Sequence, residues 1–295
     1  MDLVASIRVM STNSNDAPQR VLLLGDTHGS EQWIARAARV ADDLGLDGIV
    51  QVGDFGYLPR DGWHQRFLDT AERLLADVGT PLWFLRGNHD DADALERLVR
   101  SGHTDEVGAL RVSPHIRYLP CGTRWKWGAT RLGALGGAFS VNRRELVEGT
   151  TWWAGEVIEP AAVTRLGTAP LDVLVTHEAP LRSRTIRDRY AYVGGPVDEV
   201  CTTQRRLVDD AVRATGADVV VHGHHHTRYE ERSGSSLIVG LDCEAWDSMA
   251  VLDTATAAVS TLCATAMHRA AATSGDSRLR PSQYAYRQLT SAQAS

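Results

Sequence analysis

The chain has almost no lysine and no long apolar run. Lys126 is its single lysine, so its 31 basic residues are nearly all arginines, and 37 acidic residues bring the net charge to −6. This balance gives no reason to expect non-specific binding to nucleic acid, which could enter only as a substrate. No segment approaches the ~18 consecutive apolar residues of a membrane helix, and the N-terminus lacks the apolar core of a signal peptide. We therefore expect no association with a membrane.

Cysteine is also scarce. The four cysteines are far apart and form no CxxC pair, which predicts reduced, mostly buried thiols and a cytoplasmic location. The 43% hydrophobic and 23% charged residues are ordinary for a soluble globular protein. Both ends are polar and lack apolar periodicity. We assign residues 1–19 to a disordered N-terminal lead, 20–263 to one domain and 264–295 to a flexible C-terminal tail.

In the first half, short apolar runs alternate with helical patterns. Strands are expected at 21–24, 48–52 and 81–86, and helices at 31–44, 63–78 and 92–99, with Ser30 as the cap of the first helix. Such alternation is typical of a mainly parallel sheet covered by helices on both faces. Ligands of such sheets bind beyond the carboxyl ends of the strands.

The second half begins differently. A β-hairpin is predicted around Gly128, followed by a long irregular segment, residues 136–158, of a length often found in functional lids. Neighbouring residues of an extended chain point to opposite sides, so at most one of Trp152 and Trp153 should be buried. Strands at 171–175, 219–222, 237–241 and 249–252 and a helix at 197–214 complete the prediction.

Five expected strand ends carry side chains that can bind metals. They are Asp26 with His28; Asp54; Asn88 with His89 and Asp90; His177; and His224 with His226. Each cluster alone could be an ordinary turn, a helix cap or a structural histidine. Together they offer too many ligands for one tetrahedral zinc ion, but enough for two metal ions that share a carboxylate.

Mixed imidazole and carboxylate ligands favour Mn, Fe, Zn, Ni or Co over Mg or Ca. Two such ions ~3.5–4 Å apart stabilise the attacking and leaving oxygens of an in-line phosphoryl displacement and generate hydroxide at neutral pH. The sequence therefore points to phosphoryl chemistry.

The order and content of these clusters resemble the signature blocks of the calcineurin-like metallophosphoesterases. The matching stretches are Gly25-Asp26-Thr27-His28-Gly29, Gly53-Asp54, Gly87-Asn88-His89-Asp90, Thr176-His177 and Gly223-His224-His225-His226. The resemblance implies a four-layer α/β/β/α sandwich with a dimetal site. It assigns Asp26, His28 and His226 to one metal ion, Asn88, His177 and His224 to the other, and Asp54 to both. His225 would point away, and His222 is interpreted as a packed strand residue.

The resemblance implies hydrolysis of a phosphomonoester or phosphodiester through a metal-bridging hydroxide, with manganese the favoured metal and a nucleotide a candidate substrate. His89 would act over the substrate, with its ring oriented by Asp90. The alternative is a non-catalytic metal-binding scaffold of the same fold. Neither the substrate nor the oligomeric state follows from the sequence.

Three further residues are candidates for substrate contact. Arg182 and Arg184 lie in an arginine-rich stretch, 182–189, that is expected to be a loop directly after His177. Arginine forks match phosphate oxygens, although water and Asp188 could equally satisfy these charges. Trp152 could stack on a nucleobase or pack against the sheet. Glu178 is interpreted as a solvent-exposed charge.

Overall fold

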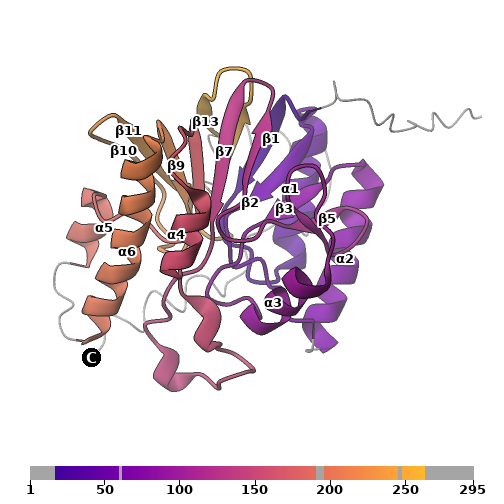
Figure 1. Ribbon diagram of the computed structural model, residues 1–295. Helices are drawn as coiled ribbons and strands as arrows, with labels where there is room; N and C mark the ends of the chain where they lie inside the picture. The colour runs from indigo at the N-terminus through magenta and orange to yellow at the C-terminus, as the bar shows by residue number, and fades with distance from the viewer. Residues whose placement is uncertain (1–16, 60–61, 191–195, 245–247, 263–295) are drawn as a thin grey trace, which may run out of the picture.

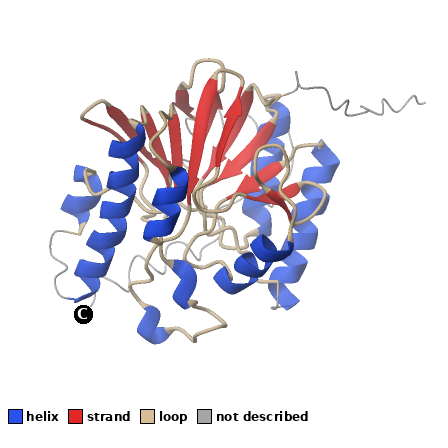
Figure 2. Ribbon diagram, viewed as in Figure 1, coloured by secondary structure: helices blue, strands red, loops and turns tan. Residues whose placement is uncertain are grey.

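The computed structural model describes residues 17–59, 62–190, 196–244 and 248–262. Two β-sheets lie face to face, and helices cover the outer face of each (Figures 1 and 2). The first sheet runs in the spatial order β13 (Val259–Thr261), β12 (Met249–Asp253), β1 (Arg20–Leu24), β2 (Gly48–Gln51), β3 (Leu82–Phe84), β5 (Ile116–Tyr118) and β4 (Leu110–Arg111). The second runs β10 (Tyr229–Ser233), β11 (Ser236–Gly240), β9 (Val219–His222), β8 (Val173–Thr176), β7 (Thr130–Leu135) and β6 (Arg124–Trp127).

Strand alternation explains the layers. In β1, Leu22 and Leu24 face the helices α1 (Glu31–Asp43), α2 (Gly62–Val78) and α3 (Ala92–Ser101), while Val21 and Leu23 face the second sheet. On the other side, Leu174 and Val220 pack against α4 (Pro160–Leu166) and α6 (Pro196–Thr215). Each central strand is thus buried on both faces, and the four-layer α/β/β/α sandwich is confirmed.

The helices expected on both faces of the first sheet cover only its outer face, because a second sheet packs against the other face. The hairpin β6–β7 starts the second sheet, and β7 pairs with β8 in parallel rather than with the first sheet. Each sheet is parallel at its centre and antiparallel at its edges. The carboxyl ends of β1, β2 and β3 therefore meet those of β8 and β9 at one edge of the sandwich.

Most local predictions hold. Ser30 caps α1 by accepting from the backbone N–H of Trp33. The segment 136–158 is irregular apart from the 3₁₀ turns η1 (Arg143–Glu145) and η2 (Ala154–Glu156). The sequence patterns do not predict the short elements α4, β4, β10 and β13. The arginine-rich stretch is not a loop: Ser183 caps the helix α5 (Arg184–Arg189).

The predicted tail and almost all of the predicted N-terminal lead lie outside the described residues. Within them, Cys121, Cys201 and Cys243 are free and of intermediate burial. No helix in the described ranges is long and apolar enough to cross a membrane.

Candidate metal centre

The five loops that follow β1, β2, β3, β8 and β9 converge where the two sheets meet. Two glycines permit this approach between the sheets. A Cβ on Gly53 would lie 2.4 Å from the ring of His177, and a Cβ on Gly223 would lie 2.0 Å from a carboxylate oxygen of Asp26. Any larger residue at either position would push the loops of one sheet away from those of the other.

Several of these loops have a strained backbone. His28, Asp54, His224 and His226 all have positive φ angles, between 44° and 65°. Non-glycine residues seldom adopt this conformation, which costs about 1–3 kcal/mol each, and such strain clusters at functional sites. Four of the seven predicted metal ligands are therefore held in conformations that local preference opposes.

One group of ligands combines the loops after β1 and β9. The Nε2 atom of His226 lies 3.1 Å from Oδ2 of Asp26 and 3.1 Å from Nε2 of His28. The His28 nitrogen is 3.9 Å from the same carboxylate oxygen. Asp26 is fully buried, whereas about 30% of each histidine side chain is exposed (29% and 32%). The group is therefore open to solvent on its imidazole side.

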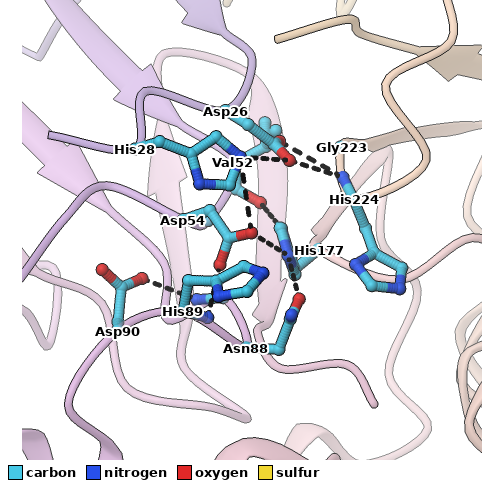
Figure 3. A network of polar contacts seen from close by, with 12 residues as sticks. Asp26, His28, Val52, Asp54, Asn88, His89, Asp90, His177, Gly223 and His224 are labelled. Atoms are coloured by element: carbon cyan, nitrogen blue, oxygen red, sulfur yellow. Dashed lines mark hydrogen bonds and ion pairs between the residues drawn. The ribbon is translucent and has the colours of Figure 1, made fainter. Parts of the chain in front are cut away.

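Asp54 lies at the centre of the cluster (Figure 3). Its Oδ1 accepts a hydrogen bond of 2.8 Å from the backbone N–H of His89. Its Oδ2 is 3.9 Å from Nε2 of His28 and 3.4 Å from Nε2 of His177. One oxygen is thus engaged with the backbone, while the other faces the ligands of both halves.

A second group forms around His177, which is fully buried. Its Nδ1–H donates to the carbonyl of Val52 over 3.0 Å, which leaves Nε2 directed at Oδ1 of Asn88, also 3.0 Å away. In a neutral ring of this tautomer, two electron pairs face each other. The gap between them therefore favours a positive charge, either a proton or a metal ion.

The pKa values of two histidines show the same effect of the buried carboxylates, which favour positive charge on their neighbours. Burial would lower the pKa of His177, but Asp54 and Asp26 raise it to about 9. Burial opposes the charge of His226 too, yet its hydrogen bond with Asp26 raises its pKa to about 11. The carboxylates thus draw protons onto two imidazoles, and bound metal ions would replace those protons.

His224 is placed differently from the other predicted ligands. Its backbone N–H donates to Asp26, over 3.1 Å to Oδ2. Its Nε2 lies 3.8 Å from Glu178, and its ring centroid lies 5.1 Å from that of His177, whose place is seen in Figure 3. The groups that could hold a metal ion are Asp26 with His28 and His226; Asp26 with Asp54 and His177; and Glu178 with His224 and His225. The structure brings six predicted ligands together around Asp26 and Asp54, and it places the seventh, His224, between His177 and Glu178.

Asp90 does not orient the ring of His89. Its carboxylate is fully buried and accepts hydrogen bonds from four backbone N–H groups, of Phe55, Gly56, Tyr57 and Gly87. These bonds join the loops after β2 and β3, so Asp90 acts on the shape of both loops. The expectation of a contact with the neighbouring ring is wrong, because the amides of the adjacent loop occupy the carboxylate.

The two candidate arginines do not line the cluster. The guanidinium of Arg182 is paired with Asp209 of α6, with Nε 2.6 Å from Oδ1. Arg184 begins α5, and its backbone N–H donates to Glu231 of β10. The first contact ties this part of the chain to α6 and the second ties it to the edge strand β10, rather than to the cluster.

Glu178 is not a solvent-exposed charge: only 1% of it is exposed. Its Oε1 lies 2.6 Å from Nε2 of His225 and accepts from the backbone N–H of Ala179. His225 therefore points away from Asp54, as the resemblance implied. His222 is a packed strand residue, as interpreted, and its Nε2 is 2.6 Å from the hydroxyl of Tyr229.

The segment 136–158 supplies two residues that the sequence did not suggest. Ser140 contacts the side-chain amide of Asn88, and Glu156 in turn contacts Ser140. They are 16 residues apart, and no periodic pattern joins them. Of the two adjacent tryptophans, Trp153 is buried and Trp152 is half-buried, as the alternation predicted.

Comparison with known proteins agrees with this architecture. Residues 19–228 match the model of the calcineurin-like phosphoesterase family. The chain belongs to the calcineurin-like phosphoesterases. This confirms the resemblance found in the sequence, and members of this family usually bind two divalent metal ions.

Solved structures resemble the chain at low sequence identity. A protein of Thermus thermophilus, TT1561, is 15% identical with a TM-score of 0.54, and the match covers 84% of this chain and 99% of that one. A novel archaeal phosphodiesterase is 12% identical (82% and 98% covered, TM-score 0.42), and the phosphopantetheinyl hydrolase of Mycobacterium tuberculosis 15% identical (76% and 90% covered, TM-score 0.43). No curated protein matches the chain.

Proposed function

We propose that the chain is a dimetal phosphoesterase that hydrolyses phosphomonoesters or phosphodiesters, with a nucleotide as the candidate substrate. The observation that carries this proposal is the position of Asp54. One of its oxygens faces His28 and His177 together, at the junction of two buried ligand groups. A single carboxylate in this position can be shared by two ions.

The donor set fits two transition-metal ions, with manganese favoured. Asp26, His28 and His226 would hold one, and Asn88 and His177 the other, with Asp54 common to both. His224, whose ring lies 5.1 Å from that of His177, would complete the second set. When bound, such ions supply a nucleophilic hydroxide at neutral pH and neutralise the charge of the phosphoryl group.

The protein's own contribution is positioning and proton transfer. The backbone N–H of His89 is fixed by Asp54, and its ring stands 5.4 Å from that of His28, on the half-exposed side of the cluster. From there it can donate a proton to the departing oxygen of the substrate. A non-catalytic scaffold of this fold is expected to have lost some of the metal ligands. This chain keeps all seven and His89, so the alternative gains no support.

The proposal is tested by a screen of the metal-free protein. After chelation we expect no hydrolysis of p-nitrophenyl phosphate, bis-p-nitrophenyl phosphate, nucleotides or cyclic nucleotides. Two equivalents of Mn²⁺ per chain should restore activity toward at least one of these substrates, and Mg²⁺ or Ca²⁺ should restore less. A protein that binds two Mn²⁺ ions and hydrolyses none of them would instead support the scaffold.

For substrate contact we propose Trp152 together with Arg143. Arg143 is exposed, and its guanidinium lies 4.6 Å from the ring centroid of Phe139 and 5.9 Å from that of Trp152. The backbone N–H of Arg143 donates to the carbonyl of Ser140, which is the residue that contacts Asn88. The cation thus lies one turn of chain from Ser140, which contacts the predicted ligand Asn88, and the indole lies beside the cation.

Trp152→Ala is expected to raise KM for nucleotides about tenfold and to leave p-nitrophenyl esters within about twofold, because stacking on a base is worth about 1–3 kcal/mol. Steady-state kinetics on both kinds of substrate would measure this. Val141→Ala is the matched control, since this exposed side chain lies on the same segment. Equal losses on both substrates with normal folding would assign Trp152 to packing instead.

A further inference from the structure

A chain of three buried side chains runs from the metal centre into the segment 136–158. The Nδ2 of Asn88 donates to Oγ of Ser140 over 3.0 Å, and this hydroxyl donates to Oε2 of Glu156 over 2.6 Å. The backbone N–H of Ser140 donates to the other carboxylate oxygen, over 2.9 Å. All three residues are at most 2% exposed.

The direction of these hydrogen bonds determines which end of the Asn88 amide faces the centre. Burial raises the pKa of Glu156, but two donors of Ser140, its backbone N–H and its hydroxyl, face the two carboxylate oxygens. The ionised carboxylate can only accept, so the hydroxyl of Ser140 gives its proton to Glu156. The hydroxyl oxygen is then left with lone pairs alone, and only the NH₂ end of Asn88 can bond to it. The amide oxygen is consequently turned toward His177, where its Oδ1 lies 3.0 Å from Nε2.

Ser140 and Glu156 are themselves anchored to the loop after β3, which carries Asn88. The carbonyl of Glu156 accepts from Ala138, and the N–H of Gly137 donates to the carbonyl of Arg86, at the end of β3. The guanidinium of Arg86 donates to the carbonyl of Val157 over 2.9 Å. Ser140 and Glu156 are thus held on both sides by contacts that do not involve the metal ligands.

We infer that Ser140 and Glu156 are positioning residues for the metal centre: they hold the amide of Asn88 so that its oxygen, rather than its NH₂ group, is presented to a metal ion. This rests on the proposed dimetal function. Nothing in the sequence pattern marks these two residues, because they lie outside the five strand-end clusters. They also make the segment 136–158 part of the metal centre rather than a detachable lid.

The inference is tested by titrating the metal-free protein with Mn²⁺, followed by calorimetry and by electron paramagnetic resonance. Ser140→Ala removes the oxygen that accepts from the Asn88 amide. In Glu156→Gln, the side-chain oxygen can accept from the backbone N–H of Ser140, and the NH₂ group then faces the Ser140 hydroxyl, which no longer has an acceptor there. Each should raise the Kd of one of the two Mn²⁺ binding steps by about 10- to 100-fold, the usual effect of losing an outer partner of a metal ligand. The other step should change less than about threefold.

Thr151→Ala is the matched control. Its hydroxyl accepts from the backbone N–H of Val147 within the same segment and does not contact Asn88. It should leave both binding steps unchanged. Circular dichroism and thermal unfolding of each variant establish folding, and Ser140→Ala, which deletes a single oxygen atom, is the variant expected to fold even if Glu156→Gln does not.

A second experiment, made in the Asn88→Asp variant, separates an orienting role of Ser140 from general structural support of the metal centre. In Asn88→Asp the ligand has two equivalent oxygens, so no orientation needs to be selected. Adding Ser140→Ala to Asn88→Asp should therefore change the Mn²⁺ Kd less than about threefold, in contrast to its effect beside Asn88. The same loss in both backgrounds would overturn the orienting role.

The outcomes distinguish this inference from the proposed function. If the wild-type protein binds two Mn²⁺ ions and both variants bind them with wild-type affinity, Ser140 and Glu156 have no positioning role, while the dimetal centre stands. If the wild-type protein binds no metal, the proposed function fails and this inference fails with it.

Discussion

Asp54→Ala is expected to abolish phosphoesterase activity and to leave the purified protein with well under two metal ions per chain. One carboxylate oxygen of Asp54 faces His28 and His177 together. Without it, neither half of the centre keeps its full set of ligands, and the two remaining groups lose their shared negative charge. Asp26→Ala, by contrast, should affect mainly the ion held with His28 and His226.

Elemental analysis of the purified variants, combined with activity on the best substrate, measures this effect. Asp54→Asn is the matched control, because asparagine tolerates the positive φ of 55° at this position and can still accept from the backbone N–H of His89. It should fold as the wild type does and lose the charge alone. An unchanged content of two metal ions in Asp54→Ala would show that the ions lie elsewhere.

His89→Ala is expected to retain two metal ions and to lose activity in proportion to the basicity of the leaving group. A p-nitrophenolate departs without a proton, whereas the alkoxide of a nucleoside or an alkyl ester needs one. General acid catalysis typically contributes about 10²–10⁴-fold, so we expect a loss of that size on alkyl and nucleoside esters. The loss on p-nitrophenyl esters should be less than about tenfold.

Kinetics over a series of leaving groups, with metal analysis of the same preparations, measures this difference. His89→Gln is the second variant, since glutamine can donate a hydrogen bond but cannot transfer a proton as a general acid does. A uniform loss over all leaving groups would mean that His89 positions the substrate or stabilises charge. A fall in metal content would make His89 a metal ligand.

Local patterns alone determined most of the helices and strands and the inventory of the site. Short apolar runs mark β1, β2, β8 and β9, because strands buried on both faces need apolar residues at successive positions. The polar residues that follow them were identifiable because parallel strands end at a common edge. The residue types at those ends then restricted the chemistry to a centre with mixed imidazole and carboxylate ligands.

The tertiary structure decided which partners the polar side chains meet. Asp90 looked like a partner for its neighbour His89, but the loop after β2 folds over it and, with Gly87, supplies four amides. Glu178 looked exposed, but β9 brings His225 onto it. In both cases the deciding contacts come from a segment more than 30 residues away, which no local pattern contains.

Contacts between distant segments also explain why local sequence patterns predict neither the division into two sheets nor the support of Asn88 by the segment 136–158. Whether β7 joins the first sheet or begins a second depends on which arrangement buries both faces of every central strand, and that is a property of the whole domain. Ser140 and Glu156 lie in irregular chain, where no period marks a buried position. Sequence determined which groups could bind metal ions, and the packing of distant segments decided how those groups are turned, because each hydrogen bond needs a partner that only the folded chain brings within reach.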